Sequence, residues 1–290
     1  MMTLPSEDTM RTSYGTRQLL LLTLCAALAG TAAAQQPPAA APPPNFSPTA
    51  QAAWVGIGTG AFAPIPGWPA PVGQDPAHPY VPNGAAGRQP THRISDTSNP
   101  NLKQWAKDVM KKDNDEVLAG KFAFTARSSC MAAGVPGFLV LLAPGGLTIV
   151  QSPDEVTMIV DGNAETRHIK LNAAHAANAK PSWYGDSVGH YEGDTLVIDT
   201  IGLNNKTFLD NYRTPHSDKL HVTERWRMIE DDKKIEVELW LDDPETFNAP
   251  FKMLRRYERM DREFMEYICA ENNSANIFDY GTPTASKPDF

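Results

Sequence analysis

A mainly β fold, an antiparallel up-and-down barrel with one helix in front of it, is the fold class that this sequence predicts. Two observations predict it. From residue 146 onward the apolar residues alternate with a period of two, and the joints between the apolar runs are short and turn-like. Tight turns join antiparallel neighbours, because parallel strands need long crossover connections. A sandwich and a cone-shaped α+β barrel are the alternatives.

The strands follow one another with turn residues at joints such as 161–163 and 242–244. Strand 221–229 should place Trp226 inside the barrel, and the next strand should add Val237 and Leu239. The candidate strands are 147–151, 156–160, 166–171, 183–191, 195–201, 221–229, 234–241, 253–260 and 263–269.

A single helix is predicted before the strands. Ser98 or Asn99 can cap it, Pro100 suits its first turn, and Gly120 can end it. Its apolar stripe is expected to be a packing face, and it consists of Leu102, Trp105, Val109 and Met110.

The N-terminal region divides into two parts. Residues 1–34 have the features of a secretory signal, with an apolar run at 19–29 and small residues before Gln35. Residues 35–95 are rich in Pro, Ala and Gly, so they are either a loose tether or an ordered strap. The barrel domain with its leading helix is then 96–280. A periplasmic or secreted protein is expected, with no membrane span after cleavage.

Composition limits the classes of partner. The net charge of −8 argues against a nucleic-acid-binding protein with a broad basic face. No dinucleotide fingerprint, phosphate-binding loop or serine-hydrolase elbow is present, so no cofactor is expected. The sequence leaves the oligomeric state open.

Two cysteines remain after signal cleavage, Cys130 and Cys269. In an oxidising compartment an isolated pair most simply forms one disulfide. A catalytic cysteine is the alternative, although neither residue lies in a nucleophile motif.

The run 183–200, with the sequence WYGDSVGHYEGDTLVIDT, resembles the signature of a family of uncharacterised exported bacterial proteins. Shorter matching pieces are 215–217, 223–225, 243–244 and 266–272, so the resemblance covers about residues 120–273. It implies membership and no activity. The meander and its Gly-Asp-Thr-Leu hairpin are also similar to lipocalin-like barrels, a likeness of fold that assigns no function.

Charged residues on apolar faces are the first candidates for chemistry. Glu224 falls in the apolar set of its strand beside Trp226, and Arg255 falls in the apolar set of another strand beside Tyr257. A buried carboxylate needs a partner, so Glu224 is expected to pair with Arg255 or Arg225, or to share a proton. A structural bridge and a catalytic acid or base are both compatible with this pattern.

The signature hairpin supplies a second cluster. If Glu192 and Gly193 form its two-residue turn, Asp186 faces Asp199, and His190 shares their side of the sheet. Two close carboxyl groups have different pKa values, because the charge of one disfavours ionisation of the other. Together with an imidazole they are sufficient for general acid–base chemistry. Turn capping is the structural alternative.

The loop 212–221 should lie at one rim of the barrel. His216 is expected to contact a ligand there, and a solvent-exposed polar loop without a ligand is the structural alternative. Zinc coordination by His216, Asp218 and His221 is a weaker alternative, because the spacing is not that of a standard site and no fourth ligand is evident; no metal is therefore expected.

Two functions follow from these patterns. One is a cofactor-independent lyase or isomerase acting on a small apolar or aromatic molecule, and the other is a non-catalytic binding protein for such a molecule. The predicted catalytic residues are Glu224, His190, Asp186 and Asp199, and the predicted substrate-binding residues are His216, Trp226, Arg255 and Tyr257.

Overall fold

The structure is a computed structural model. It describes residues 42–47, 52–57, 61–80, 93–121, 123–124, 130–140, 146–160 and 165–261. The predicted signal at 1–34, the predicted strand at 263–269 and Cys269 lie outside the described residues. The disulfide between Cys130 and Cys269 therefore stays a prediction.

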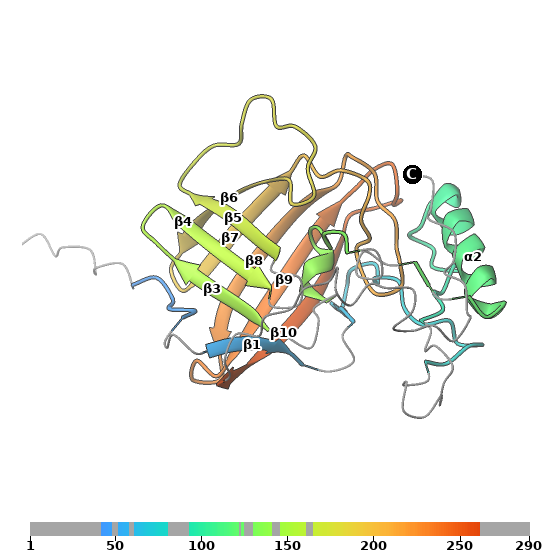
Figure 1. The fold of residues 1–290 in the computed structure, drawn as a ribbon, viewed down its shortest axis with the longest axis horizontal. Coiled ribbons are helices and arrows are strands. Elements are labelled where there is room, and N and C mark those ends of the chain that lie inside the picture. The colour runs from blue at the N-terminus through green and yellow to red at the C-terminus, as the bar shows by residue number, and fades with distance from the viewer. Residues whose placement is uncertain are drawn as a thin grey trace, which may run out of the picture. The chain divides into compact units, whose positions relative to one another are not determined.

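The predicted barrel is confirmed (Figure 1). In the described part of the chain, nine strands close into one barrel that is mostly antiparallel, and the short β2 (Ala63–Pro64) extends the sheet beside the last strand. The barrel strands are β1 (Ala52–Gly56), β3 (Leu147–Gln151), β4 (Glu155–Val160), β5 (Glu165–Leu171), β6 (Asp186–Glu192), β7 (Thr195–Ile201), β8 (His221–Ile229), β9 (Lys234–Asp242) and β10 (Phe251–Asp261).

The strand that closes the barrel comes from the Pro-rich region. β1 pairs with β10 along its whole length and with β3 at the single pair Trp54–Leu147. Trp54 is fully buried, and its indole Nε1 donates a hydrogen bond to the carbonyl oxygen of Phe46 at 2.8 Å. This aromatic residue therefore fixes part of residues 35–95 to the barrel as a strand.

One pair of barrel strands differs from the antiparallel expectation. β5 and β6 are parallel, with Lys170 opposite Val188 and Leu171 opposite Gly189. The connection between them, residues 172–185, is long enough to return the chain to the same end of the barrel, as a parallel pair requires. We call residues 172–185 the crossover segment.

The interior follows the predicted alternation. Trp226, Val237 and Leu239 are each 0% exposed, which confirms their predicted place inside the barrel. These side chains come from the adjacent strands β8 and β9, where Trp226 pairs directly with Val237, so they lie side by side on the inner wall of the barrel.

The predicted helix is present as α2 (Gln104–Leu118). It begins later than the predicted caps, because Asp96 accepts hydrogen bonds from Ser98, residues 97–98 and 100–101 form turns, and Leu102 pairs with Phe247 in a β-bridge. Gly120, at φ +93°, follows its end, as predicted. Trp105 attaches α2 to the β9–β10 connection through a hydrogen bond from Nε1 to the carbonyl oxygen of Glu245, at 2.7 Å. No helix among the described residues combines the length and hydrophobicity needed to cross a bilayer.

Candidate functional site

Inside the barrel, Glu224 forms an ion pair with Arg167. Both side chains are at most 1% exposed. The guanidinium Nη2 donates to Oε1 of Glu224 at 2.7 Å, and Nη1 donates to Oε2 at 3.1 Å. The predicted burial of Glu224 is confirmed, but its partner lies on β5 and is neither Arg255 nor Arg225.

The groups around this pair use its remaining hydrogen-bonding capacity. Trp226 Nε1 donates to Oε2 of Glu224 at 3.0 Å. Arg167 also donates to the hydroxyls of Ser187 and Thr200, the latter at 2.8 Å. Three donors hold this carboxylate, two of them in a bidentate pair with a fully buried guanidinium, so this geometry is that of a structural bridge.

The predicted substrate-binding residues of the interior lie beside this bridge. Trp226 and Tyr257 stack with their rings 6.1 Å apart and 10° from parallel. The Tyr257 hydroxyl donates to the carbonyl oxygen of Leu139 at 2.7 Å, and burial raises its pKa. Arg255 donates from Nη1 to the carbonyl oxygen of Ile57 at 2.9 Å, while its Nε has no partner among the described residues. These side chains fill the inner face by contacting one another.

The hairpin of β6 and β7 has a different register from the expected one. Its turn is Gly193–Asp194, so Glu192 pairs with Thr195, and Val188 rather than Asp186 lies opposite Asp199. The predicted turn one residue earlier is wrong, because the positive φ of +61° belongs to Gly193 at the first turn position.

The outer face of this hairpin carries the other predicted catalytic residues. His190 is exposed, and its Nε2 lies 3.1 Å from a carboxylate oxygen of Glu192. Asp186 and Asp199 are only partly exposed, and they face outward on β6 and β7. Glu224 faces inward, so the barrel wall separates it from these three residues.

An imidazole does join the two aspartates, but it is that of His175 from the crossover segment. His175 Nδ1 lies 3.1 Å from Oδ2 of Asp186, and Nε2 lies 2.7 Å from Oδ1 of Asp199. His221, at the start of β8, places its Nε2 at 2.7 Å from the other oxygen of Asp199. We call Asp186, His175, Asp199 and His221 the outer-face chain.

Hydrogen bonds set the charge states along the outer-face chain. Burial acts to raise the pKa of Asp199, but hydrogen bonds from His221 and His175 outweigh it and lower that pKa to about 2. The pKa of Asp186 is also lowered to about 2, since bonds from Lys170, the Ala176 amide and His175 outweigh burial. The bond to Asp199 raises the pKa of His221. Both aspartates are therefore anionic near neutral pH.

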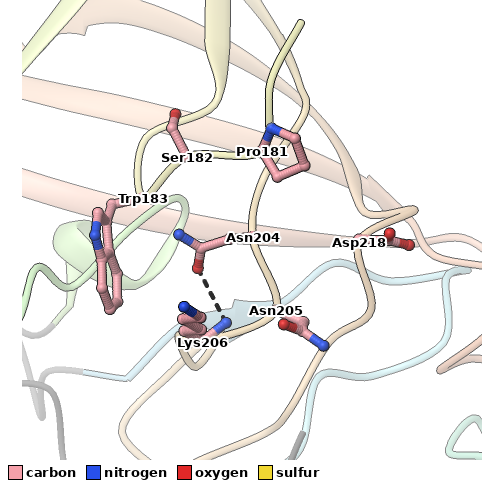
Figure 2. Close-up of a pocket in the computed structure, with 7 residues that line it drawn as sticks. All are labelled: Pro181, Ser182, Trp183, Asn204, Asn205, Lys206 and Asp218. Atoms are coloured by element: carbon pink, nitrogen blue, oxygen red, sulfur yellow. Dashed lines mark hydrogen bonds between the residues drawn. The ribbon is translucent and has the colours of Figure 1, made fainter.

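A pocket of about 540 Å³ opens next to the first residues of β6 and β8. Figure 2 shows Trp183 on one side of it, Asp218 on the other, and the side chains of residues 204–206 between them. Pro181 and Ser182 complete the lining. We call this the rim pocket. Its wall combines one aromatic ring, two amides and a hydroxyl with one cationic and one anionic residue.

Backbone hydrogen bonds connect the two loops that form the rim pocket. The Ser182 amide donates to the carbonyl oxygen of Gly202 at 3.0 Å, and the Asn204 amide donates to the carbonyl oxygen of Ser182 at 2.9 Å. The Oδ1 atom of Asn204 accepts a bond from the Lys206 backbone amide at 3.0 Å (Figure 2). The side-chain oxygen of Asn204 is therefore engaged, and its Nδ2 group is available to donate a hydrogen bond.

His216 lies in the same connection as Asp218, does not line the pocket and is 1% exposed. Its Nδ1 donates to the carbonyl oxygen of Ser217 at 2.9 Å, so its Nε2 accepts from the Thr207 hydroxyl at 2.7 Å. Burial lowers its pKa, which keeps the ring neutral. His216 thus holds the loop that carries Asp218. Among the described residues, no group of three His, Cys, Asp or Glu side chains could hold a metal ion.

Arg167 and His175 are absent from the residues that the sequence singles out. A signal for Arg167 exists, because it alternates with Ile169 and Leu171 on β5 as Glu224 does with apolar residues on β8. His175 lies in irregular backbone, where no periodicity marks its direction.

No family model, curated protein or solved structure matches this chain.

Proposed function

We propose that this chain is an exported, non-catalytic binding protein for a small molecule, with the barrel as its scaffold and the rim pocket as its binding site. The observation that supports this proposal is the contrast between the barrel interior and the rim pocket. The Arg167–Glu224 pair in the interior is bonded by neighbouring protein side chains, whereas the rim pocket presents an aromatic ring and several polar groups to solvent.

The lining favours an uncharged ligand rich in hydroxyl groups, such as a sugar. The lining carries no cluster of like charges, because Lys206 is its one cation and Asp218, its one anion, is paired with Lys219 at 3.1 Å. Asn205 offers an amide that can both donate and accept, and Asn204 offers its Nδ2 as a donor, since its Oδ1 accepts from the Lys206 backbone amide. Trp183 supplies a flat apolar surface for the C–H face of a sugar ring. An apolar ligand was expected because the predicted site lay inside the barrel. The interior around Glu224 is filled by protein side chains, so that expectation does not apply to the rim pocket.

Export is part of the proposal and depends on the signal-like residues 1–34. The mature protein should begin at Gln35. Intact-mass measurement of the protein from a periplasmic fraction tests this, and recovery of the uncleaved chain in the cytoplasm would count against export.

The binding proposal is tested by calorimetric titration of the mature protein with glucose and maltose. For ligands of this size we expect dissociation constants on the order of 1 mM. Trp183→Ala should weaken binding by about tenfold, since it removes the stacking surface. Trp68→Ala is the matched control, because Trp68 is also a partly exposed tryptophan but lines no part of the pocket, and it should bind like wild type. Equal weakening in both variants, or no heat from either sugar, would overturn the proposal.

One observation favours the catalytic alternative, a lyase or isomerase. Asp199 holds His221, whose side chain is 37% exposed, in the arrangement of a general base and its orienting carboxylate. Chromatography and mass spectrometry of maltose incubated with the protein distinguish the two functions. Unchanged maltose supports the binding protein. A dehydrated or isomerised product that disappears with His221→Gln would favour the enzyme.

A further inference from the structure

Arg255 is a buried arginine whose charge has no counter-charge among the described residues. Its side chain lies on the inner face of β10, in the pair with Val237 of β9, and the residue is 6% exposed. Its Nη1 donates to the carbonyl oxygens of Ile57 at 2.9 Å and Ala61 at 3.4 Å. Carbonyl oxygens accept these bonds without supplying a negative charge. Within the described part of the chain, Arg255 therefore forms no ion pair with a carboxylate.

Neither the interior carboxylate of Glu224 nor the hydroxyl of Tyr257 neutralises this charge. Glu224 is bonded to Arg167 and Trp226. Arg255 lies over the ring of Tyr257, with Cζ 5.4 Å from the ring centroid. Burial raises the pKa of the Tyr257 hydroxyl and outweighs the opposing charge of Arg255, so the hydroxyl stays neutral. A buried guanidinium without a counter-charge is destabilising, and a bound anion would offset that effect.

The donors that remain lie on one edge of the guanidinium. Nε is buried and has no hydrogen-bond partner among the described residues. Nη2 lies against β1, where a Cβ on Gly56 would be 1.8 Å from it, so the guanidinium occupies space that glycine leaves open. Nε and Nη2 carry parallel N–H groups. Such an edge matches the two oxygens of one carboxylate.

We propose that Arg255 is the centre of a second binding site, which holds a small carboxylate side-on against Nε and Nη2 between β10 and β1. A carboxylate brings a single negative charge, which equals the charge that Arg255 leaves unbalanced. A doubly charged ion such as sulfate would leave an excess negative charge in the interior. Arg255 lines no part of the rim pocket, so this site goes beyond the proposed function and does not rest on it.

Nuclear magnetic resonance of the arginine Nε–H groups tests this site in the mature protein. Arg255→Lys identifies the signal of Arg255, and Arg256→Lys identifies that of Arg256. Sodium acetate then replaces sodium chloride at a constant ionic strength of about 0.15 M and a pH of about 6.5, where acetate is ionised. The Arg255 signal should shift until it saturates, with a midpoint on the order of 10 mM for so small a ligand.

Arg256 supplies the control in the same spectrum. It is the next residue of β10, it is exposed, and it already has a carboxylate partner. Its Nε and Nη2 both face Oε2 of Glu236, at 2.8 Å and 2.6 Å. Its signal should therefore stay in place as acetate is added. Sodium sulfate at the same ionic strength should move the Arg255 signal less than acetate does.

Two glycine variants separate binding from folding. Gly56→Ala places a methyl group where Nη2 lies, and the atoms that must move are the end of a flexible side chain. The guanidinium should be displaced while β1 keeps its pairing, so the acetate midpoint should rise about tenfold. Gly73→Ala is the matched control, because neither glycine has a positive φ and a Cβ on Gly73 meets nothing within 4 Å. It should keep the wild-type midpoint.

Three results would overturn the site. An Arg255 signal that does not follow acetate, or follows it no more than that of Arg256, would show that added carboxylate does not bind there, including the case in which the chain itself supplies one. A response to sulfate as large as that to acetate would contradict selection of a carboxylate. Equal midpoints in Gly56→Ala and Gly73→Ala would place acetate elsewhere. None of these results involves sugar, so failure of this site is separate from failure of the proposed function.

Discussion

At the scale of single residues, alternation along a strand predicts which face a side chain occupies, but not its partner. Glu224 is buried as the pattern of β8 predicts, and its partner Arg167 lies 57 residues earlier in the chain. The apolar alternation of β5 places Arg167 on the inner face, yet nothing local aligns two strands that are not neighbours in the sheet. The cross-barrel distance is set by closure of the whole sheet.

The buried Arg167–Glu224 ion pair leads to a prediction about stability. Glu224→Gln should leave a buried guanidinium without its counter-charge and reduce the free energy of unfolding by about 3–5 kcal/mol. Glu238→Gln is a suitable control, because Glu238 forms a partly exposed pair with Lys252, and it should cost about 0–1 kcal/mol. Urea denaturation measures both.

The double variant Arg167→Met with Glu224→Leu should recover most of the lost stability, since no unpaired charge remains. A similar small cost for Glu224→Gln and Glu238→Gln would contradict the burial of the Arg167–Glu224 pair. It would also reopen the interior as a site for acid–base chemistry.

At the scale of elements, the sequence predicts the order of strands β3 to β10 better than their pairing. The turns Gly193–Asp194 and Glu230–Asp232 are marked by their residue types, and both join antiparallel neighbours. The parallel pair β5–β6 has no such mark, because it consists of two residue pairs, and the crossover segment contains no regular element. β1 is hard to predict, since it is a short strand in a proline-rich region.

Two glycines with positive φ provide a matched test of the close approach between the crossover segment and β7. A Cβ on Gly185 (φ +64°) would lie 2.4 Å from the carbonyl oxygen of Ile201, whereas one on Gly193 (φ +61°) meets nothing within 4 Å. Gly193→Ala should cost about 1 kcal/mol from backbone strain alone. Gly185→Ala should cost about 3 kcal/mol, because it adds a clash with backbone. Thermal unfolding compares them, and equal losses would contradict the close approach.

At the scale of the whole molecule, the rim pocket depends on segments that are distant in sequence. The sequence predicts that loop 212–221 lies at the rim, and Asp218 of this loop does line the pocket. Residues 204–206 belong to the same β7–β8 connection as Asp218, and residues 181–183 join them because the parallel pairing of β5 and β6 returns the crossover segment to that end. A binding site of this kind cannot be derived from motifs, since its parts are brought together by topology.

The most direct test of the central claim, that ligand binds at the rim and not inside the barrel, is the indole N–H region of an ¹⁵N NMR spectrum. The six tryptophans give one signal each, and Trp183→Phe and Trp226→Phe assign the two that matter. Glucose or maltose should shift the Trp183 signal and leave that of the buried Trp226 unchanged, while phenol, a small aromatic probe, should shift neither. Movement of the Trp226 signal with phenol, and none of the Trp183 signal with either sugar, would place the site inside the barrel and contradict the proposal.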